Sequence, residues 1–346
     1  MPTAKTECTE LSVGFGLLGI EPGGLAPTQI ADLFSGSLSF EKYTAYLGEY
    51  DSDPHLYTQF VRVGHQLRGI YPLFANLSQI IWSGPQQQAA TTSASKDLFA
   101  ANVPISIKNE SNVVLNPSPY NLFVTIPSGS MPASQAQNWY EHTDSQGIQN
   151  LYLFVRNRGN VHLPALFSEF EQIASKTDRR ALQAAIQNFL GNDRAEFDQL
   201  YQQMCRTVAS RSAGRFNENL QTTMSTNIRS SVLENIIKQF FRVNAVPYIL
   251  TGLDDRRSFA LRIPDITEWK RHWRFISLVA TPDLTRGQSV VDLCMTLEQK
   301  DSRQTYELPF HVEIRWSHGK FCGNPEGKLY KEFTWSSVPF FTNILG

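Results

Sequence analysis

Apolar residues follow different spacings in different parts of the chain. From Pro54 to about Asn76 they recur every three or four residues, which predicts a helix with Pro54 in its first turn. The run "SQIIW" that follows predicts a buried strand, and "SGPQQQAATTSAS" predicts a polar loop. Near the N-terminus, "SVGFGLLGIEPGGLAP" contains several glycines without a phosphate-loop motif, and we expect loops with a short strand there.

The pattern changes twice more along the chain. From about Leu163 to Val243 apolar stripes at helical spacing follow capping aspartates, as in "DRAEFDQLYQQMCRTVAS". After Asn244, alternating runs separated by turn signals predict an antiparallel sheet. Between these regions, "NVVLNPSPYNLFVTIPSGSMPASQAQNWYEH" is expected to be mostly loop, and "LYLFVRNRG" fits either a strand or a buried helix. The expected organisation is an N-terminal region with an α/β core (1–160), a helical segment (161–243) and a β-rich C-terminal part (244–346).

A hairpin is predicted within "KDLFAANVPISIKN". In its second strand Val103, Ile105 and Ile107 share one face, and Pro104, Ser106 and Lys108 share the other. If the two apolar stretches pair, Asp97 at the start of the first reaches the face that carries Ser106 and Lys108. A carboxylate and an ammonium group would then converge at one end of a small sheet.

Composition narrows the classes of protein that fit. The chain has 346 residues, 41% of them hydrophobic, and a net charge of −1, so a nucleic-acid partner would have to be bound by local patches of basic residues. The four cysteines form no CxxC pair, which argues against a zinc site and favours a reducing compartment such as the cytoplasm. No apolar run is long enough for a membrane span, and the N-terminus lacks the apolar core of an export signal.

The residues of the hairpin suit phosphodiester hydrolysis. Mg²⁺ prefers carboxylate and water oxygens, and a neighbouring lysine can orient the attacking water and stabilise developing charge. Asp97 and the tripeptide Ser106-Ile107-Lys108 resemble the motif of the PD-(D/E)xK nuclease superfamily, and within it the type II restriction endonucleases. The resemblance covers roughly residues 54 to 110. It implies a restriction-endonuclease-like mixed central sheet flanked by helices.

The resemblance also implies roles for individual residues. Asp97 would bind Mg²⁺ and Lys108 would position the water, while Ser106 stands where the family usually has an acid and Lys96 where it has a proline. Some members of the superfamily have a serine at that position and a second acid from elsewhere. Glu110 continues the face of Ser106 and Lys108, so it is expected to assist and to bind the metal. Two weaker alternatives from the upstream helical region are Glu49 and Gln66.

A second stretch matches the motif more literally. "TPDLTRGQSVVDLCMTLEQK" contains Pro282-Asp283 and Glu298-Gln299-Lys300. The alternative is an ordinary half-buried strand, with Glu298 and Lys300 on its solvated face and Asp283 in the preceding turn. We expect the ordinary strand, and keep Asp283, Glu298 and Lys300 as the rival centre.

Basic and aromatic side chains alternate in the C-terminal third, as in "EWKRHWRF" and "RWSHGKF". Such residues can bind phosphates and base edges, and the expected DNA-binding set is Lys270, Arg271, Arg274, Arg315 and Lys320. Alternatively, the tryptophans pack inward on an amphipathic strand.

The resulting hypothesis is a Mg²⁺-dependent, sequence-specific endonuclease of double-stranded DNA. By analogy it would act as a homodimer alongside a DNA methyltransferase that recognises the same site. The alternative is a non-catalytic DNA-binding or defence-complex subunit that has lost the second acid, as Ser106 would indicate.

Overall fold

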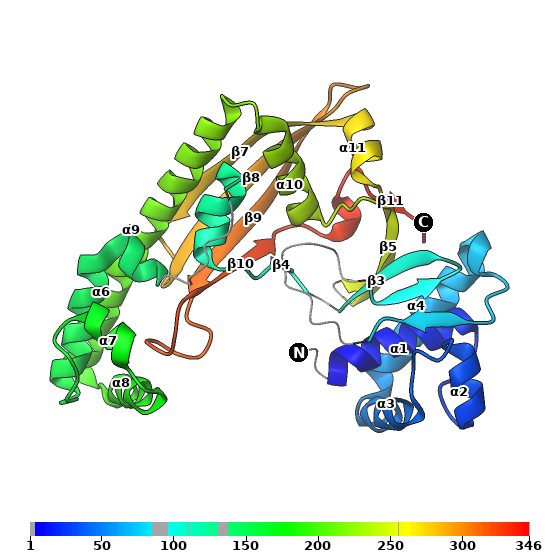
Figure 1. Cartoon of the computed structure of the whole chain (residues 1–346), viewed down its shortest axis with the longest axis horizontal. Helices are drawn as coiled ribbons and strands as arrows, with labels where there is room; N and C mark the ends of the chain where they lie inside the picture. Colours follow the sequence, from blue (N-terminus) through cyan, green and yellow to red (C-terminus); the bar gives the residue numbers. More distant parts are fainter. Residues whose placement is uncertain (1–3, 85–95, 110, 131–137, 255, 346) are drawn as a thin grey trace.

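Two β-sheets organise the molecule, each at the centre of its own lobe (Figure 1). The computed structural model describes residues 4–84, 96–109, 111–130, 138–254 and 256–345. One sheet has six strands in the order β1-β2-β3-β5-β6-β11, and the other has five in the order β4-β10-β9-β8-β7. The chain is therefore of the mixed helix-and-sheet class that the sequence predicts.

The first lobe combines the six-stranded sheet with the N-terminal helices. Its strands are β1 (Ile80–Trp82), β2 (Leu98–Ala100), β3 (Val103–Asn109), β5 (Tyr248–Asp254), β6 (Arg257–Ile263) and β11 (Thr342–Asn343). The pair β3 and β5 is parallel, and every other neighbouring pair is antiparallel. The helices are α1 (Ala4–Leu18), α2 (Pro27–Leu33), α3 (Phe40–Ser52) and α4 (Pro54–Ile70), followed by the 3₁₀ turn η1 (Pro72–Phe74).

Helix α1 corrects the expectation of loops near the N-terminus. Its glycines allow a close crossing with α4: a Cβ added at Gly16 would lie 2.0 Å from the Val61 carbonyl oxygen, and one at Gly64 would lie 2.2 Å from that of Val13. Glycine therefore marks a helix contact here and not a turn. The residues of α1 from Cys8 to Leu18 are all buried.

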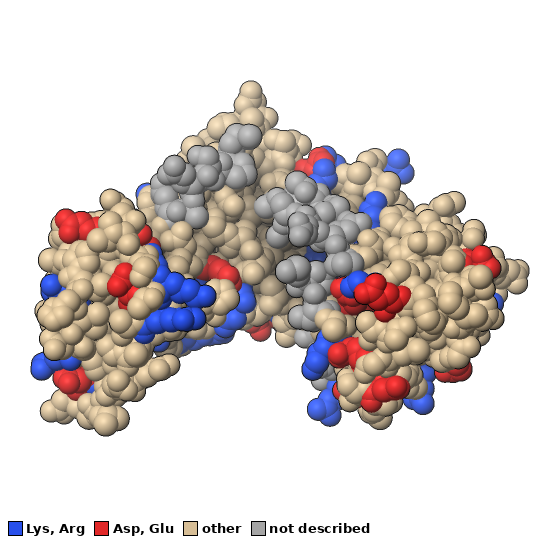
Figure 2. Space-filling view, turned by 60° about the horizontal axis from the view of Figure 1, so that its bottom comes forward, with Lys and Arg blue, Asp and Glu red and all other residues tan. Residues whose placement is uncertain are grey.

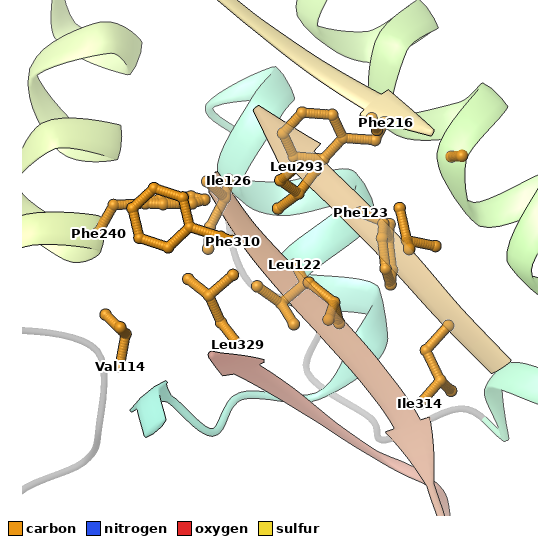
Figure 3. Close-up of a cluster of buried hydrophobic side chains, with 14 of the residues drawn as sticks. Val114, Leu122, Phe123, Ile126, Phe216, Phe240, Leu293, Phe310, Ile314 and Leu329 are labelled. Atoms are coloured by element: carbon orange, nitrogen blue, oxygen red, sulfur yellow. The ribbon is translucent and has the colours of Figure 1, made fainter. Parts of the chain in front are cut away.

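The second lobe places helices over the five-stranded antiparallel sheet. Its strands are β4 (Val113–Leu115), β7 (Trp273–Asp283), β8 (Ser289–Gln299), β9 (Thr305–Arg315) and β10 (Glu326–Lys331). The helical elements are η2 (Asn121–Thr125), α5 (Ile126–Ser128), α6 (Trp139–Arg158), α7 (Phe167–Ile173), α8 (Lys176–Asn188), α9 (Gly191–Met224), α10 (Arg229–Phe241), α11 (Ile266–His272) and the 3₁₀ turn η3 (Trp335–Ser337). Figure 3 shows how side chains from η2, α9 and α10 meet those of the strands, with Phe123, Phe216 and Phe240 over Leu293, Phe310 and Leu329.

Most sequence expectations of secondary structure are confirmed. Helix α4 starts at Pro54 behind the N-cap Asp53, residues 163–243 are largely helical, and the last third supplies most of both sheets. "LYLFVRNRG" belongs to the long helix α6. The Pro- and Ser-rich stretch before it, expected to be mostly loop, contains β4, η2, α5 and the start of α6.

Each lobe contains residues from more than one of the three segments expected from the sequence. Strands β5, β6 and β11 come from the C-terminal part, yet they complete the sheet that β1 to β3 begin. An ion pair with a buried lysine joins the sheets: the Lys331 ammonium on β10 lies 3.4 Å from the Asp254 carboxylate at the end of β5, and it also donates to Asn112 Oδ1 at 3.0 Å. None of the helices in the described part of the chain combines the length and apolarity that crossing a bilayer requires.

Candidate active site

The β2–β3 hairpin forms as predicted and gathers polar groups around Asp97. Leu98 pairs with Ile105, which brings Asp97 beside Ser106. One carboxylate oxygen, Oδ2, accepts the Ile107 backbone N–H at 2.6 Å and the Ser106 hydroxyl at 3.3 Å. Asp97 is 8% exposed and Ser106 is fully buried. A buried carboxylate held by two donors is fixed in position.

Lys108 continues the same face of β3. Burial and the nearby Arg242 guanidinium lower the pKa of Lys108 to about 8, against the opposing effect of Asp97 and Glu10. Across the parallel pair, Lys108 lies opposite Gly252 of β5, where φ is 141° and an added Cβ would lie 1.8 Å from the Lys108 carbonyl oxygen. Only glycine fits there, so β5 fixes the backbone that carries Lys108.

The second acid of the site is Glu10, on helix α1. Its side chain is buried, and one oxygen accepts the indole N–H of Trp82 on β1 at 2.8 Å. Burial and the neighbouring Asp97 raise the pKa of Glu10 to about 8, while the Trp82 hydrogen bond and Lys108 oppose the shift. Glu10, Asp97 and Lys108 thus lie within electrostatic reach of one another, on three different elements.

Sequence reasoning missed Glu10 because it expected no helix there. The signal was present: "CTELSVGFGLL", residues 8–18, carries a single acid within a run that helix α1 buries completely. A charge buried without an obvious partner often marks a functional site.

The acids proposed from sequence have other positions. Glu110 lies outside the described residues. Glu49 accepts a hydrogen bond from the Tyr57 hydroxyl at 2.8 Å on the α3–α4 side, and Gln66 is exposed on α4.

The carboxylates of Glu10 and Asp97 fit a hard divalent cation. Burial is the main cause of the raised pKa of Glu10 and the charge of Asp97 adds to it, so a cation bound by both carboxylates would favour their charged forms. Within the described ranges no three His, Cys, Asp or Glu side chains form a metal-binding group, so the protein would supply two ligands. Mg²⁺ accepts such a partial set, because it retains water and substrate oxygens in its coordination shell.

The rival centre is not assembled in this fold. Asp283 pairs with Val290 at one end of the β7–β8 hairpin, whereas Glu298 pairs with Arg274 at the other. Val290 and Glu298 are eight residues apart on β8, which at a rise of about 3.3 Å per residue is about 26 Å. The expected half-buried strand is confirmed, with Leu293, Met295 and Leu297 buried on its inner face. Two details differ: Glu298 is buried between two arginines instead of solvated, and Asp283 ends strand β7 instead of lying in the turn.

The charges of this hairpin are neutralised locally. Glu298 lies 2.8 Å from the Arg274 guanidinium and 3.1 Å from that of Arg303. Asp283 pairs with Arg286 at 2.9 Å, and the Lys300 ammonium donates to the Lys270 carbonyl oxygen.

The five expected DNA-binding residues form two separate groups. Lys270 and Arg271 lie on α11 next to Arg274 at the start of β7, whereas Arg315 and Lys320 lie at the far end of β9 and in the following loop. The length of β9, about 33 Å at a rise of about 3.3 Å per residue, separates them.

Most of these five residues already have partners. Lys270 pairs with Glu234, Arg274 with Glu298, and Arg315 with Glu313. The Lys320 ammonium lies 4.4 Å from the centre of the Tyr201 ring. Trp269 and Trp273 of "EWKRHWRF" are buried, so these tryptophans pack inward, and the segment forms the end of helix α11 and the start of β7 instead of one strand.

Comparison with known proteins adds no relative. No protein-family model matches the chain, nor does any curated protein or solved structure. The assignment of the site therefore depends on its own geometry.

Proposed function

We propose that this chain is a divalent-metal-dependent phosphodiesterase that cuts double-stranded DNA at specific sites, as a type II restriction endonuclease does. The observation that carries the proposal is the convergence of two buried carboxylates, Glu10 and Asp97, with the amine of Lys108. A helix, an antiparallel β1–β2–β3 meander and a strand parallel to β3 surround them. This arrangement resembles the core order of the PD-(D/E)xK superfamily, which supports the restriction-endonuclease-like fold.

Each side chain has a defined role in the proposed reaction. Glu10 and Asp97 would bind Mg²⁺, and when bound the ion polarises the phosphate and lowers the pKa of a bound water. Trp82 orients Glu10, while the Ser106 hydroxyl and the Ile107 N–H orient Asp97. Lys108, with a pKa of about 8, is suited to hold the attacking water and to accept its proton at mildly alkaline pH.

The shape of the molecule supports a polymeric substrate. Figure 2 shows a hollow between the two lobes, with Lys and Arg side chains gathered on the left-hand lobe beside it. Basic side chains along a concave surface attract the phosphate backbone of nucleic acid. A homodimer would place two such sites on the two strands of one symmetric target, and a methyltransferase of the same specificity would protect host DNA.

Cleavage of mixed plasmid and phage DNA with Mg²⁺ tests the proposal. Wild type should give discrete fragments that disappear with EDTA and in Lys108→Ala, but persist in Lys300→Ala. Loss of cleavage in Lys300→Ala alone would move the active site to the β7–β8 hairpin.

A second function is favoured by Ser106, which occupies the usual acid position. In a non-catalytic DNA-binding subunit of a defence complex, the wild type would bind duplex DNA without cutting it. Calorimetric titration with Mg²⁺ separates the two, because a nuclease site should bind the ion through Glu10 and lose that binding in Glu10→Gln.

A further inference from the structure

The side-chain oxygen of Ser83 is buried next to the candidate active site without a hydrogen-bond partner. Ser83 follows strand β1, and its backbone N–H donates to the Asp97 carbonyl oxygen at 3.0 Å. Its Oγ is buried, and the described part of the chain offers it no partner. Burying an unpaired hydroxyl lowers stability, so such a group usually serves a water, an ion or a ligand. Ser83 therefore indicates an occupant beside Asp97.

Ser83 and Asp97 carry their side chains on the same face of the sheet. Trp82 and Leu98 pair across β1 and β2, and both are buried in the core of the first lobe. The backbone hydrogen bond from Ser83 to Asp97 continues this pairing by one residue. Because side chains alternate along a strand, both of these residues point to the opposite face from Trp82 and Leu98. Directly opposed residues of two paired strands have Cβ atoms about 5 Å apart, so the hydroxyl and the carboxylate are neighbours.

Two consecutive residues of the β1 segment bind both acids of the site. Trp82 donates its indole N–H to Glu10, and Ser83 donates its backbone N–H to Asp97. In the described chain both hydrogen bonds to the Asp97 carboxylate end on Oδ2 and come from β3. Ser83 approaches from β1, on the other side of Asp97. A ligand bound by the Asp97 carboxylate would therefore meet the unpaired hydroxyl.

We propose that Ser83 is a positioning residue of the metal site, whose hydroxyl holds a water molecule of the bound divalent cation. This inference rests on the proposed function. A serine hydroxyl can accept a hydrogen bond from a water and donate its own proton to a carboxylate or phosphate oxygen. Mg²⁺ retains several waters when few protein oxygens bind it, and residues that orient its shell tune its affinity. Cation binding would thus satisfy a hydroxyl that the protein alone leaves unpaired.

Calorimetric titration of the full chain with Mg²⁺ tests this role without any need for cleavage. The titration is run at about pH 8.5, above the pKa of Glu10, so that Glu10 is largely charged. Ser83→Ala should bind Mg²⁺ about 10-fold more weakly than wild type, and Ser83→Thr, which retains the hydroxyl, should bind it more tightly than Ser83→Ala. Ser289→Ala, the same change at a serine buried in the second lobe, should bind as wild type does.

The melting temperature in EDTA separates this role from a structural one. Ser83→Ala removes no side-chain hydrogen bond within the described chain, so it should melt at the wild-type temperature or above it. A Ser83→Ala protein that melts well below wild type in EDTA, or that binds Mg²⁺ with wild-type affinity, would overturn the proposal. A wild type that binds no Mg²⁺ would overturn it too, together with the metal-binding role of Glu10 and Asp97.

Cleavage assays then distinguish this inference from the proposed function. If wild type cuts DNA, Ser83→Ala should need about 10-fold more Mg²⁺ to reach half of its maximal rate. An unchanged Mg²⁺ requirement in Ser83→Ala would overturn the inference and leave the nuclease intact. If wild type binds Mg²⁺ with an affinity that depends on Ser83 but cuts no DNA, the positioning role stands and the nuclease proposal fails.

Discussion

The β2–β3 and β7–β8 hairpins both present an aspartate, a lysine and a polar residue two positions before the lysine, but their surroundings differ. Around the first, Glu10, Asp97 and Lys108 come from three elements, Glu10 and Asp97 are buried, and burial raises the pKa of Glu10 and lowers that of Lys108. Around the second, each acid has an arginine within 3.1 Å, from the same or a neighbouring strand or turn. Several buried ionisable groups with shifted pKa values indicate a candidate functional site, whereas local ion pairs indicate a stable surface.

Replacing each aspartate by asparagine should produce the largest difference in cleavage between the two hairpins. Asp97→Asn keeps an acceptor for the Ile107 N–H but removes the proposed metal ligand, so we expect plasmid cleavage to fall on the order of 10³-fold. Asp283→Asn should cleave within about twofold of wild type, because it disturbs only the pair with Arg286 and the hydrogen bonds from Thr285, at the end of the β7–β8 hairpin. Equal losses in the two variants, at matched melting temperature, would remove the distinction between the hairpins.

Glycine-to-alanine substitutions should produce the second-largest difference between the surroundings of the two hairpins. Gly252→Ala forces a Cβ against the Lys108 carbonyl and should reduce the free energy of unfolding by roughly 3 kcal/mol and abolish cleavage. Gly287→Ala, in the turn before β8, meets no atom within 4 Å and should change stability by less than about 0.5 kcal/mol. Urea unfolding measures both, and a Gly252→Ala protein as stable as wild type would contradict the packing of β5 against β3.

Replacing Glu10 by glutamine should reduce cleavage, whereas the same replacement of Glu298 should not. Glu10→Gln retains the Trp82 hydrogen bond but removes a ligand charge, so cleavage should fall on the order of 10²-fold while the fold persists. Glu298→Gln should leave cleavage unchanged and weaken only the pairs with Arg274 and Arg303. Single-turnover rates with saturating Mg²⁺ provide the comparison. Full activity in Glu10→Gln would show that Glu10 is not the second acid and would leave Glu110 as the candidate.

The pH dependence of stability should have opposite signs in the two regions, although the effect is the smallest. The pKa of Glu10 rises from 4.5 to about 8 on folding, so in EDTA its contribution is complete below pH 4.5 and is lost as pH rises to about 8. The hydrogen bond from Arg274 lowers the pKa of Glu298, so its contribution is present above pH 4.5 and is lost as pH falls through its folded pKa.

Urea midpoints between about pH 3 and pH 9 should therefore show two slopes. Glu10→Gln should flatten only the loss of stability between about pH 4.5 and pH 8, and Glu298→Gln only the loss below pH 4.5. An unchanged slope between about pH 4.5 and pH 8 in Glu10→Gln would show that Glu10 is not the buried group that titrates.

Local sequence patterns determined a large part of this protein. The period of α4, the capped helices of the middle segment and the alternation along β3 and β8 are all readable from neighbouring residues, because helix and strand periods are local properties. The convergence of Asp97, Ser106 and Lys108 was predicted for the same reason, since one short hairpin contains all three.

Only the tertiary structure decided what completes the site. The glycines of α1 look like turn residues until α4 lies against them, and that crossing buries Glu10 beside Asp97. The parallel pairing of β3 with β5, distant in sequence, fixes Lys108. These partners are set by packing between elements far apart in the chain, and no local period encodes which distant side chains meet.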